Sequence, residues 1–271
     1  MKNTKEFGQN RRIFELVIVS IATTLGITSL SMSPAIATPG KKYHYSHGTT
    51  AKPSHPGKFH RSPWSWQHWD PQIAPIQSTP DGKTYGQWAA EWWRWALKIP
   101  ANNHPLDSGD CRIGQKGQVW FLGGTFSQSG TPVQRNCQVP KGTKLFFPLV
   151  NAAYLAFPLS EPTDEPYLRS FLTGCDAPSN IEVSIDGRPV KNPTQYFVES
   201  SVFKAHLPSN DVLAIPDADI PNGKVVGADI GYYVFLKPLH PGKHTIKWKV
   251  SKSNCNSAQD ITYNITVKAR R

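Results

Sequence analysis

The hydrophobic pattern is most regular between residues 84 and 98, where aromatic residues recur at helical spacing. Intervals of three, four and three residues separate the members of this stripe, Tyr85, Trp88, Trp92 and Trp95. Residues at these intervals share one face of a helix. Thr84 and Gln87 have the spacing of a capping box, which satisfies free backbone amides at a helix start, and Pro100 ends the pattern. The sequence therefore predicts an amphipathic helix over residues 84–98.

The aromatic stripe of this helix has two interpretations. Such a stripe usually packs against a sheet as part of the core. Aromatic rings also stack on the apolar faces of sugars, so a sugar-binding platform is the alternative. Trp93 lies off the stripe together with Glu91 and Arg94, and we expect it to be the more exposed tryptophan. The candidate ligand-binding residues are therefore Trp92, Trp93, Glu91 and Arg94.

Most of the chain after residue 110 consists of short apolar or alternating runs separated by turn residues. The runs that predict strands are residues 118–122, 144–150, 181–185, 196–207, 231–236, 244–250 and 261–267. Asp186 and Gly187 form a turn dipeptide that closes a hairpin over residues 180–190. Residues 163–174 predict a short second helix with Thr163 as its cap. We predict a mainly β fold, a β-sandwich of the jelly-roll or immunoglobulin-like type, with one N-terminal amphipathic tryptophan-rich helix and a short second helix.

Residues 1–37 have the order of a secretion signal, with basic residues first, an apolar stretch over residues 16–30, and small residues at Ala35 and Ala37. A membrane anchor is the alternative, but this stretch is shorter than the about 20 apolar residues that span a bilayer. Arg11 and Arg12 leave twin-arginine export open beside the general route. We expect a periplasmic or extracellular protein with no transmembrane anchor after cleavage.

Residues 38–80 are rich in proline, histidine and basic residues, so we predict a disordered segment followed by a single mainly β domain over residues 81–271. His44 and His47 are spaced for a metal ion, but we favour a flexible histidine-rich tail as the simpler interpretation. The loop 102–110 gathers oxygen ligands without the residue order of a calcium loop. We expect no metal and no cofactor.

The cysteines indicate an oxidising compartment, because an even number of them in an exported chain is typical of disulfides. Four are present, Cys111, Cys137, Cys175 and Cys255, and they allow three pairings. We favour Cys111 with Cys137, which would close a local loop, and Cys175 with Cys255, which would join the two ends of the last β-rich region. The connectivity stays open at this point.

The charge of the chain favours anionic partners. The formal net charge is +11 at pH 7, and the leader carries four basic and two acidic residues, so the chain stays basic after cleavage. A basic exported protein is attracted to an anionic envelope polymer or glycan. Nucleic acid is not an expected partner in that compartment.

Several motifs together resemble a family of uncharacterised exported bacterial proteins with a tryptophan-rich helix and a C-terminal β-sandwich-like region. The segments that carry the resemblance are residues 92–100, Cys111, residues 117–122, 135–137, 140–148 and 236–246. The resemblance implies an exported compartment and a β-sandwich-like fold. It implies no catalytic residue, because the family has no assigned activity.

The sequence has no nucleophile elbow, zinc helix, phosphate loop or dinucleotide fingerprint. A glycosidase needs only two suitably separated carboxylates, and the acids considered for such a pair are Glu91, Asp107, Asp110 and Asp176. Glu91 is spaced to pair with Arg94 on the helix surface. We therefore predict a non-enzymatic binding or structural module that acts on envelope or extracellular glycan or protein, with a carbohydrate-active hydrolase as the alternative.

Overall fold

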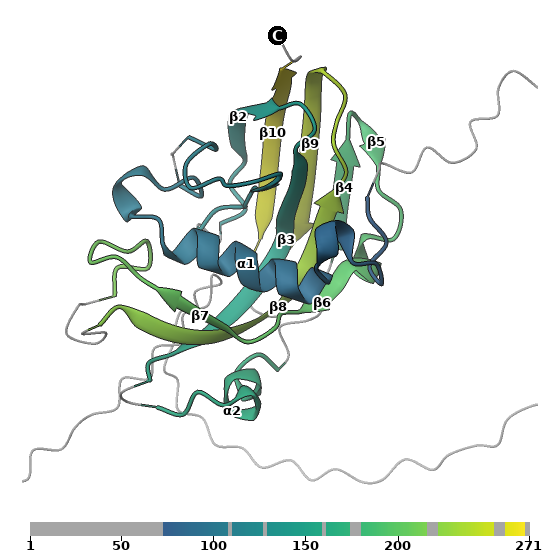
Figure 1. Ribbon diagram of the computed structural model, residues 1–271. Helices are drawn as coiled ribbons and strands as arrows, with labels where there is room; N and C mark the ends of the chain where they lie inside the picture. Colours follow the sequence, from purple (N-terminus) through teal and green to yellow (C-terminus); the bar gives the residue numbers. More distant parts are fainter. Residues whose placement is uncertain are drawn as a thin grey trace, which may run out of the picture. The chain divides into compact units, whose positions relative to one another are not determined.

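The computed structural model describes residues 73–107, 110–126, 129–158, 161–173, 180–215, 222–251 and 258–268. The predictions for the secretion signal, for residues 38–72, and for Cys175, Asp176 and Cys255 lie outside the described residues. Figure 1 shows the two helices and the strands. The helices are α1 (Tyr85–Leu97) and α2 (Glu165–Ser170). The strands are β1 (Val119–Phe121), β2 (Val133–Pro140), β3 (Lys144–Ala156), β4 (Asn180–Ile185), β5 (Arg188–Pro189), β6 (Phe197–Glu199), β7 (Phe203–His206), β8 (Lys224–Leu236), β9 (Gly242–Ser251) and β10 (Gln259–Lys268).

The first sheet has five strands in the order β1-β3-β8-β6, with β7 also paired to β8. Strands β3 and β8 run antiparallel, and their register shifts between Pro148 and Val150. Strand β1 forms an edge of the sheet and pairs in parallel with β3. Almost every residue of β3 and β8 is buried. This pattern is expected of strands that are covered on both faces.

The second sheet has the order β2-β10-β9-β4-β5, and β2 pairs in parallel with β10. Buried residues alternate with more exposed ones along β9 and β10, so one face of this sheet packs inward and the other faces solvent. Phe147 of the first sheet stacks on Trp248 of the second, with ring centroids 5.1 Å apart. The prediction of a mainly β sandwich is confirmed.

The two helices pack on the first sheet. Helix α1 contacts β7, β8, β6 and β3 and buries nine of its thirteen residues. Helix α2 covers the ends of β3 and β8 through Leu168, and the ring of Tyr154 stacks on Phe171 with centroids 4.0 Å apart. Both helices were predicted, although α2 begins after Asp164 as its cap and not after Thr163.

The capping box of α1 is confirmed. The Thr84 hydroxyl accepts from the backbone N–H of Gln87 at 3.2 Å, and the Gln87 side chain accepts from the backbone N–H of Thr84 at 2.9 Å. Within the described residues, the packed part of the chain already includes Ile73, which precedes residue 81, where we placed the start of the domain. Ile73 and Ala74 are buried, and the backbone N–H of Ala74 donates to the carbonyl of Phe235 at 2.9 Å.

Strand β2 was not predicted, because an arginine occupies one of its inward positions. Arg135 is buried between β2 and the loops before β1 and after it, where its guanidinium donates to the carbonyls of Leu106 at 2.6 Å and Gly123 at 3.0 Å. Only backbone carbonyls and the Tyr263 hydroxyl accept from it among the described residues. A charged residue that is satisfied by backbone groups breaks the apolar alternation from which strands are predicted.

The long strand predicted over residues 196–207 is two short strands, β6 and β7, separated at Ser200. The backbone N–H of Ser200 donates to the carbonyl of Asp229 at 2.8 Å, and its hydroxyl accepts from the N–H of Asp229 at 2.9 Å. The next residue, Ser201, donates its N–H to the carbonyl of Gly86 in α1 at 3.0 Å. The strand is therefore interrupted where the helix meets the sheet.

The predicted disulfide between Cys111 and Cys137 is present, with the two Cα atoms 5.8 Å apart. Such a bond is typical of proteins from oxidising compartments. In the described part of the chain, no helix is long and apolar enough to cross a membrane.

Candidate functional site

The tryptophans of α1 belong to the core. Trp92 and Trp93 are each 1% exposed. The indole N–H of Trp92 donates to the carbonyl of Leu122 at 2.7 Å, and the ring of Trp93 stacks on Phe203 with an interplanar angle of 5°. The expectation that Trp93 is exposed was therefore wrong. The sheet covers one side of the helix and residues 110–122 cover another, where Ile113 and Leu122 accept from the indoles of Trp95 and Trp92, so tryptophans on two helical faces are buried.

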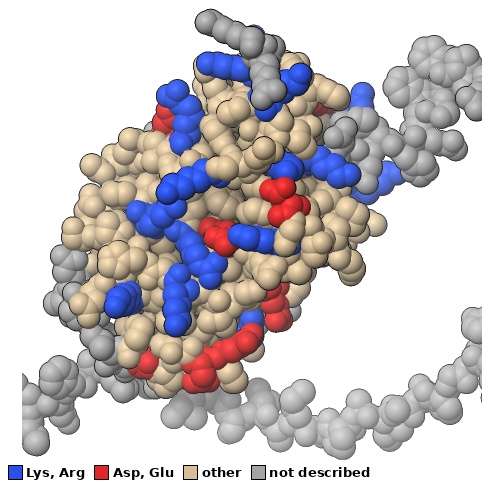
Figure 2. Space-filling model, viewed as in Figure 1, with Lys and Arg blue, Asp and Glu red and all other residues tan. Residues whose placement is uncertain are grey.

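The surface that α1 leaves exposed forms one wall of a groove of about 350 Å³. We call it the helix groove and define it by Lys83, Glu91, Arg94, Lys98 and Lys116. Its far wall is the loop before β1, and edges of buried aromatic rings form its floor. Lys and Arg side chains are spread over the face of the molecule that carries α1, with acids interspersed (Figure 2). Of the candidate ligand-binding residues, Glu91 and Arg94 thus lie in a groove, whereas Trp92 and Trp93 do not reach solvent.

Glu91 organises the cations of the helix groove. Its Oε1 accepts from the Nζ of Lys83 at 2.7 Å and lies 3.5 Å from an Nη of Arg94. The Nζ of Lys83 also lies 4.9 Å from the centre of the Trp88 ring. Among the described residues, no acidic side chain pairs with Lys98 or Lys116. The groove is therefore cationic, because its two acidic residues, Asp81 and Glu91, are opposed by four basic residues.

The acids proposed for a carboxylate pair are not brought together in this groove. Glu91 shares the groove with Asp81, which pairs with Lys144, and not with Asp107 or Asp110. Asp110 accepts from the Nε of Arg112 at 2.7 Å, and this hydrogen bonding lowers the pKa of its carboxyl group. Glu91, Asp81 and Asp110 are each paired with a basic side chain, so these carboxylates are suited to positioning their basic partners. Within the described ranges, no cluster of three or more histidine, cysteine or acidic side chains is placed to hold a metal ion.

A second groove, of about 460 Å³, lies on the other side of β1. We call it the seam groove and define it by Arg112, Trp120, Gln138, Lys141 and Lys268. It runs between β1, at the edge of the first sheet, and β2 and β10 of the second sheet. We predicted residues 118–122 as a buried strand, and this prediction missed the fact that Trp120 is only partly buried. The one signal in the sequence is the strand alternation, which places Trp120 opposite Val119 and Phe121.

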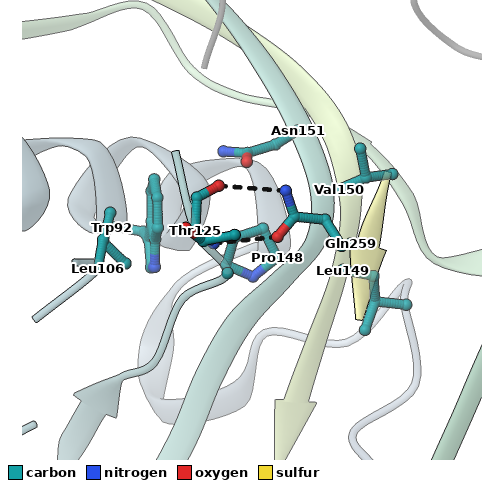
Figure 3. A pocket seen from close by; sticks show the side chains of 9 residues that line it. Trp92, Leu106, Thr125, Pro148, Leu149, Val150, Asn151 and Gln259 are labelled. Carbon is teal, nitrogen blue, oxygen red and sulfur yellow. Dashed lines mark hydrogen bonds between the residues drawn. The ribbon is translucent and has the colours of Figure 1, made fainter. Parts of the chain in front are cut away.

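A small pocket of about 20 Å³ lies between α1, β3 and β10 (Figure 3). The side chain of Gln259 accepts from the backbone N–H of Thr125 at 3.0 Å and donates to its carbonyl at 3.1 Å. Asn151 and Trp92 also line it. A cavity of this size holds about one water molecule. It has no room for a sugar or a cofactor.

A buried carboxyl group lies near this cavity. Asn151 donates to the hydroxyl of Tyr233 at 2.9 Å, and that hydroxyl donates to Asp229 Oδ1 at 2.8 Å. Burial raises the pKa of Asp229 to about 7, and the hydrogen bond from Tyr233 and the nearby polar groups of Trp93 and Asn151 act in the opposite direction. Asp229 has no exposed surface, so it is placed to influence stability and not to touch a ligand.

The fold and the grooves define a two-sheet β-sandwich domain with a buried tryptophan helix and cationic surface grooves. No protein-family model and no curated protein matches the chain. Among solved structures, the chain is similar to the cysteine protease inhibitor EhICP2 from Entamoeba histolytica, with 14% identity and a TM-score of 0.20, over 55% of this chain and 96% of the inhibitor. It is also similar to PbICP-C from a complex with falcipain-2, with 14% identity and a TM-score of 0.21, over 56% of this chain and 100% of the other. Likenesses of this size carry no argument about what the protein binds.

Proposed function

We propose that the protein is an exported, non-enzymatic module that binds an anionic glycan of the cell envelope or its surroundings in the helix groove. The observation that carries the proposal is the pair of lysines, Lys98 and Lys116, that line the groove without an acidic partner among the described residues. They stand beside Lys83 and Arg94, which Glu91 holds in place. An anionic chain supplies the charge that this groove lacks.

The chemistry of the groove fits an acidic sugar better than a simple anion. Its rim is cationic, and its floor contains the edges of Trp88, Trp95 and Phe121. A uronic acid has an apolar ring face for such a floor and a carboxylate for the rim. The disulfide, and the positive net charge that the chain keeps without its leader, also support an anionic partner outside the cytoplasm.

The test compares two variants of equal charge change. Purified oxidised chain from residue 38 is titrated with polygalacturonate and with a neutral polysaccharide, and binding is followed by calorimetry at low and high salt. The groove variant is Lys98→Gln with Lys116→Gln. The control is Lys243→Gln with Lys247→Gln, because both lysines are exposed on the outer face of β9.

We expect the groove variant to weaken binding of polygalacturonate about tenfold, which corresponds to about 1.4 kcal/mol, and the control variant to leave binding nearly unchanged. Equal weakening in both variants would show that net charge alone attracts the polymer. No binding of any anionic glycan would reject the proposal. Release of new reducing ends during incubation would instead support the hydrolase.

A further inference from the structure

We propose that the seam groove is a second subsite for the same anionic glycan, in which Trp120 stacks on a sugar ring, and that one polymer chain crosses β1 to occupy both grooves. This inference rests on the proposed function for the identity of the ligand. It assigns a separate role to residues on the far side of β1, and it identifies the ligand as a linear acidic polysaccharide.

Trp120 differs from the other tryptophans of the described residues in its exposure. Each of the others is buried, whereas Trp120 is only partly buried. Strand β1 turns Val119 and Phe121 toward the helix groove and Trp120 toward the seam groove. A partly exposed indole in a groove offers one apolar face to a ligand while its other contacts hold it in place.

The charge around Trp120 is positive. Arg112, Lys141 and Lys268 line the seam groove, and no acidic residue lines it within the described ranges. Arg112 is paired with Asp110, but Lys141 and Lys268 have no acidic partner among the described residues. An indole flanked by unpaired lysines matches a pyranose ring that carries a carboxylate, because the ring face and the charge are recognised together.

The disulfide fixes the walls of the seam groove before a ligand arrives. Cys111 precedes Arg112 on one wall, and Cys137 precedes Gln138 on the other. The bond between them ties the loop before β1 to β2. A site with fixed walls loses less conformational freedom on binding than a mobile one.

The two grooves share β1 as their common wall, so a chain that leaves one groove across β1 enters the other. Val119 and Phe121 contribute to the helix groove and Trp120 to the seam groove. When two sites bind one polymer, the second contact forms at a high effective concentration. Affinity should then increase more steeply with the length of the glycan than it would for a protein that binds in one groove alone.

The experiment measures this length dependence with three probes: galacturonic acid, a short oligogalacturonate and polygalacturonate. The oxidised chain from residue 38 is compared with Trp120→Ala, with Lys141→Gln combined with Lys268→Gln, and with the groove variant Lys98→Gln combined with Lys116→Gln. The lysine pair of the seam groove is exposed, so it tests the same site if Trp120→Ala unfolds. Near-ultraviolet circular dichroism confirms that each variant is folded.

For the unaltered chain we expect a gain of about a hundredfold in affinity from the short oligomer to the polymer, normalised to sugar units. Both seam variants should lose most of this gain and keep their affinity for the short oligomer. An unchanged gain in folded seam variants would overturn the inference while leaving the helix groove intact as a site.

The same data separate the inference from the proposed function. If the seam variants abolish binding and the helix-groove variant has no effect, the seam groove is the sole site, so the bridging part of the inference and the proposed location both fail. If none of the variants changes binding of the polymer, both proposals are rejected. If neutral galactan of matching size showed the same gain in affinity with chain length, charge recognition would be rejected for both grooves.

Discussion

The carboxyl group of Asp229 lies beneath α1 with none of its surface exposed. Burial raises its pKa from 3.8 to about 7, although the hydrogen bond from Tyr233, the nearby polar groups of Trp93 and Asn151 and the charge of Arg169 favour its ionised form. Desolvation outweighs these contacts because a buried anion loses its hydration. The substitution Asp229→Asn replaces this group by a neutral one of nearly the same shape, whose amide oxygen can still accept from Tyr233.

The sign of the effect follows from proton binding. Between pH 4 and pH 7 the folded chain keeps a proton on Asp229 that the unfolded chain has lost, since the folded pKa is the higher one. The free energy of unfolding therefore falls as the pH rises through this window, and the loss levels off above about 7. A shift of about three pKa units corresponds to about 4 kcal/mol between the two ends of the window.

The assay is urea unfolding at closely spaced pH values from 4 to 8, on the unaltered chain and on Asp229→Asn. The difference in the free energy of unfolding between the two proteins should change by about 4 kcal/mol in favour of the variant as the pH rises. A constant difference in the free energy of unfolding between the two proteins does not affect the test, because only the change of this difference with pH is compared. Asp81→Asn is the control, since Asp81 forms a surface ion pair with Lys144.

Parallel stability profiles for the unaltered chain and Asp229→Asn would refute the reasoning. They would mean that the hydrogen bonds and the charge of Arg169 compensate fully for burial, so that Asp229 is ionised in the folded protein throughout the window. A variant that loses stability relative to the unaltered chain as the pH rises would contradict the assigned direction of the pKa shift.

Two further predictions concern contacts of the backbone and the disulfide. Alanine normally stabilises a helix relative to glycine by about 1 kcal/mol. A Cβ at Gly86 would however lie 2.5 Å from the carbonyl oxygen of Glu199, so Gly86→Ala should destabilise the protein by about 2 kcal/mol in urea unfolding. A more stable variant would contradict the close approach of α1 to the backbone at Glu199. Replacing Cys111 and Cys137 by serine should lower the free energy of unfolding by about 3 kcal/mol, because their bond spans 26 residues, and an unchanged urea midpoint would show that this loop is equally restricted without the bond.

Local patterns predicted the parts of the fold that depend on neighbouring residues. The capping box at Thr84, the turn at Asp186 and Gly187, and the disulfide between Cys111 and Cys137 are present as the sequence indicated. The capping box and the turn depend on the geometry of neighbouring residues, and four cysteines allow only three pairings. A single sequence is therefore enough to predict these features.

Features that depend on contacts between distant segments were missed. Strand β2 pairs with β10 and contains the buried Arg135, whose partners come from loops elsewhere in the chain. Trp93 is buried because β7 places Phe203 against it. For Asp229 a signal did exist, since a single acid inside the long apolar run of β8 indicates a buried titratable group.

The sequence predicted the helix that lines the proposed site, but the prediction gave too much weight to the tryptophans of this helix. Because α1 buries its aromatic and alanine residues on the sheet and the neighbouring segment, its exposed surface reduces to one polar stripe. The residues of that stripe and its continuation are Gln87, Glu91, Arg94 and Lys98. In a helix with so many large apolar residues, the few polar positions are the ones that a ligand can reach. The tryptophans pack the helix into the core, and under the proposed function the exposed charges are the groups that would contact the glycan.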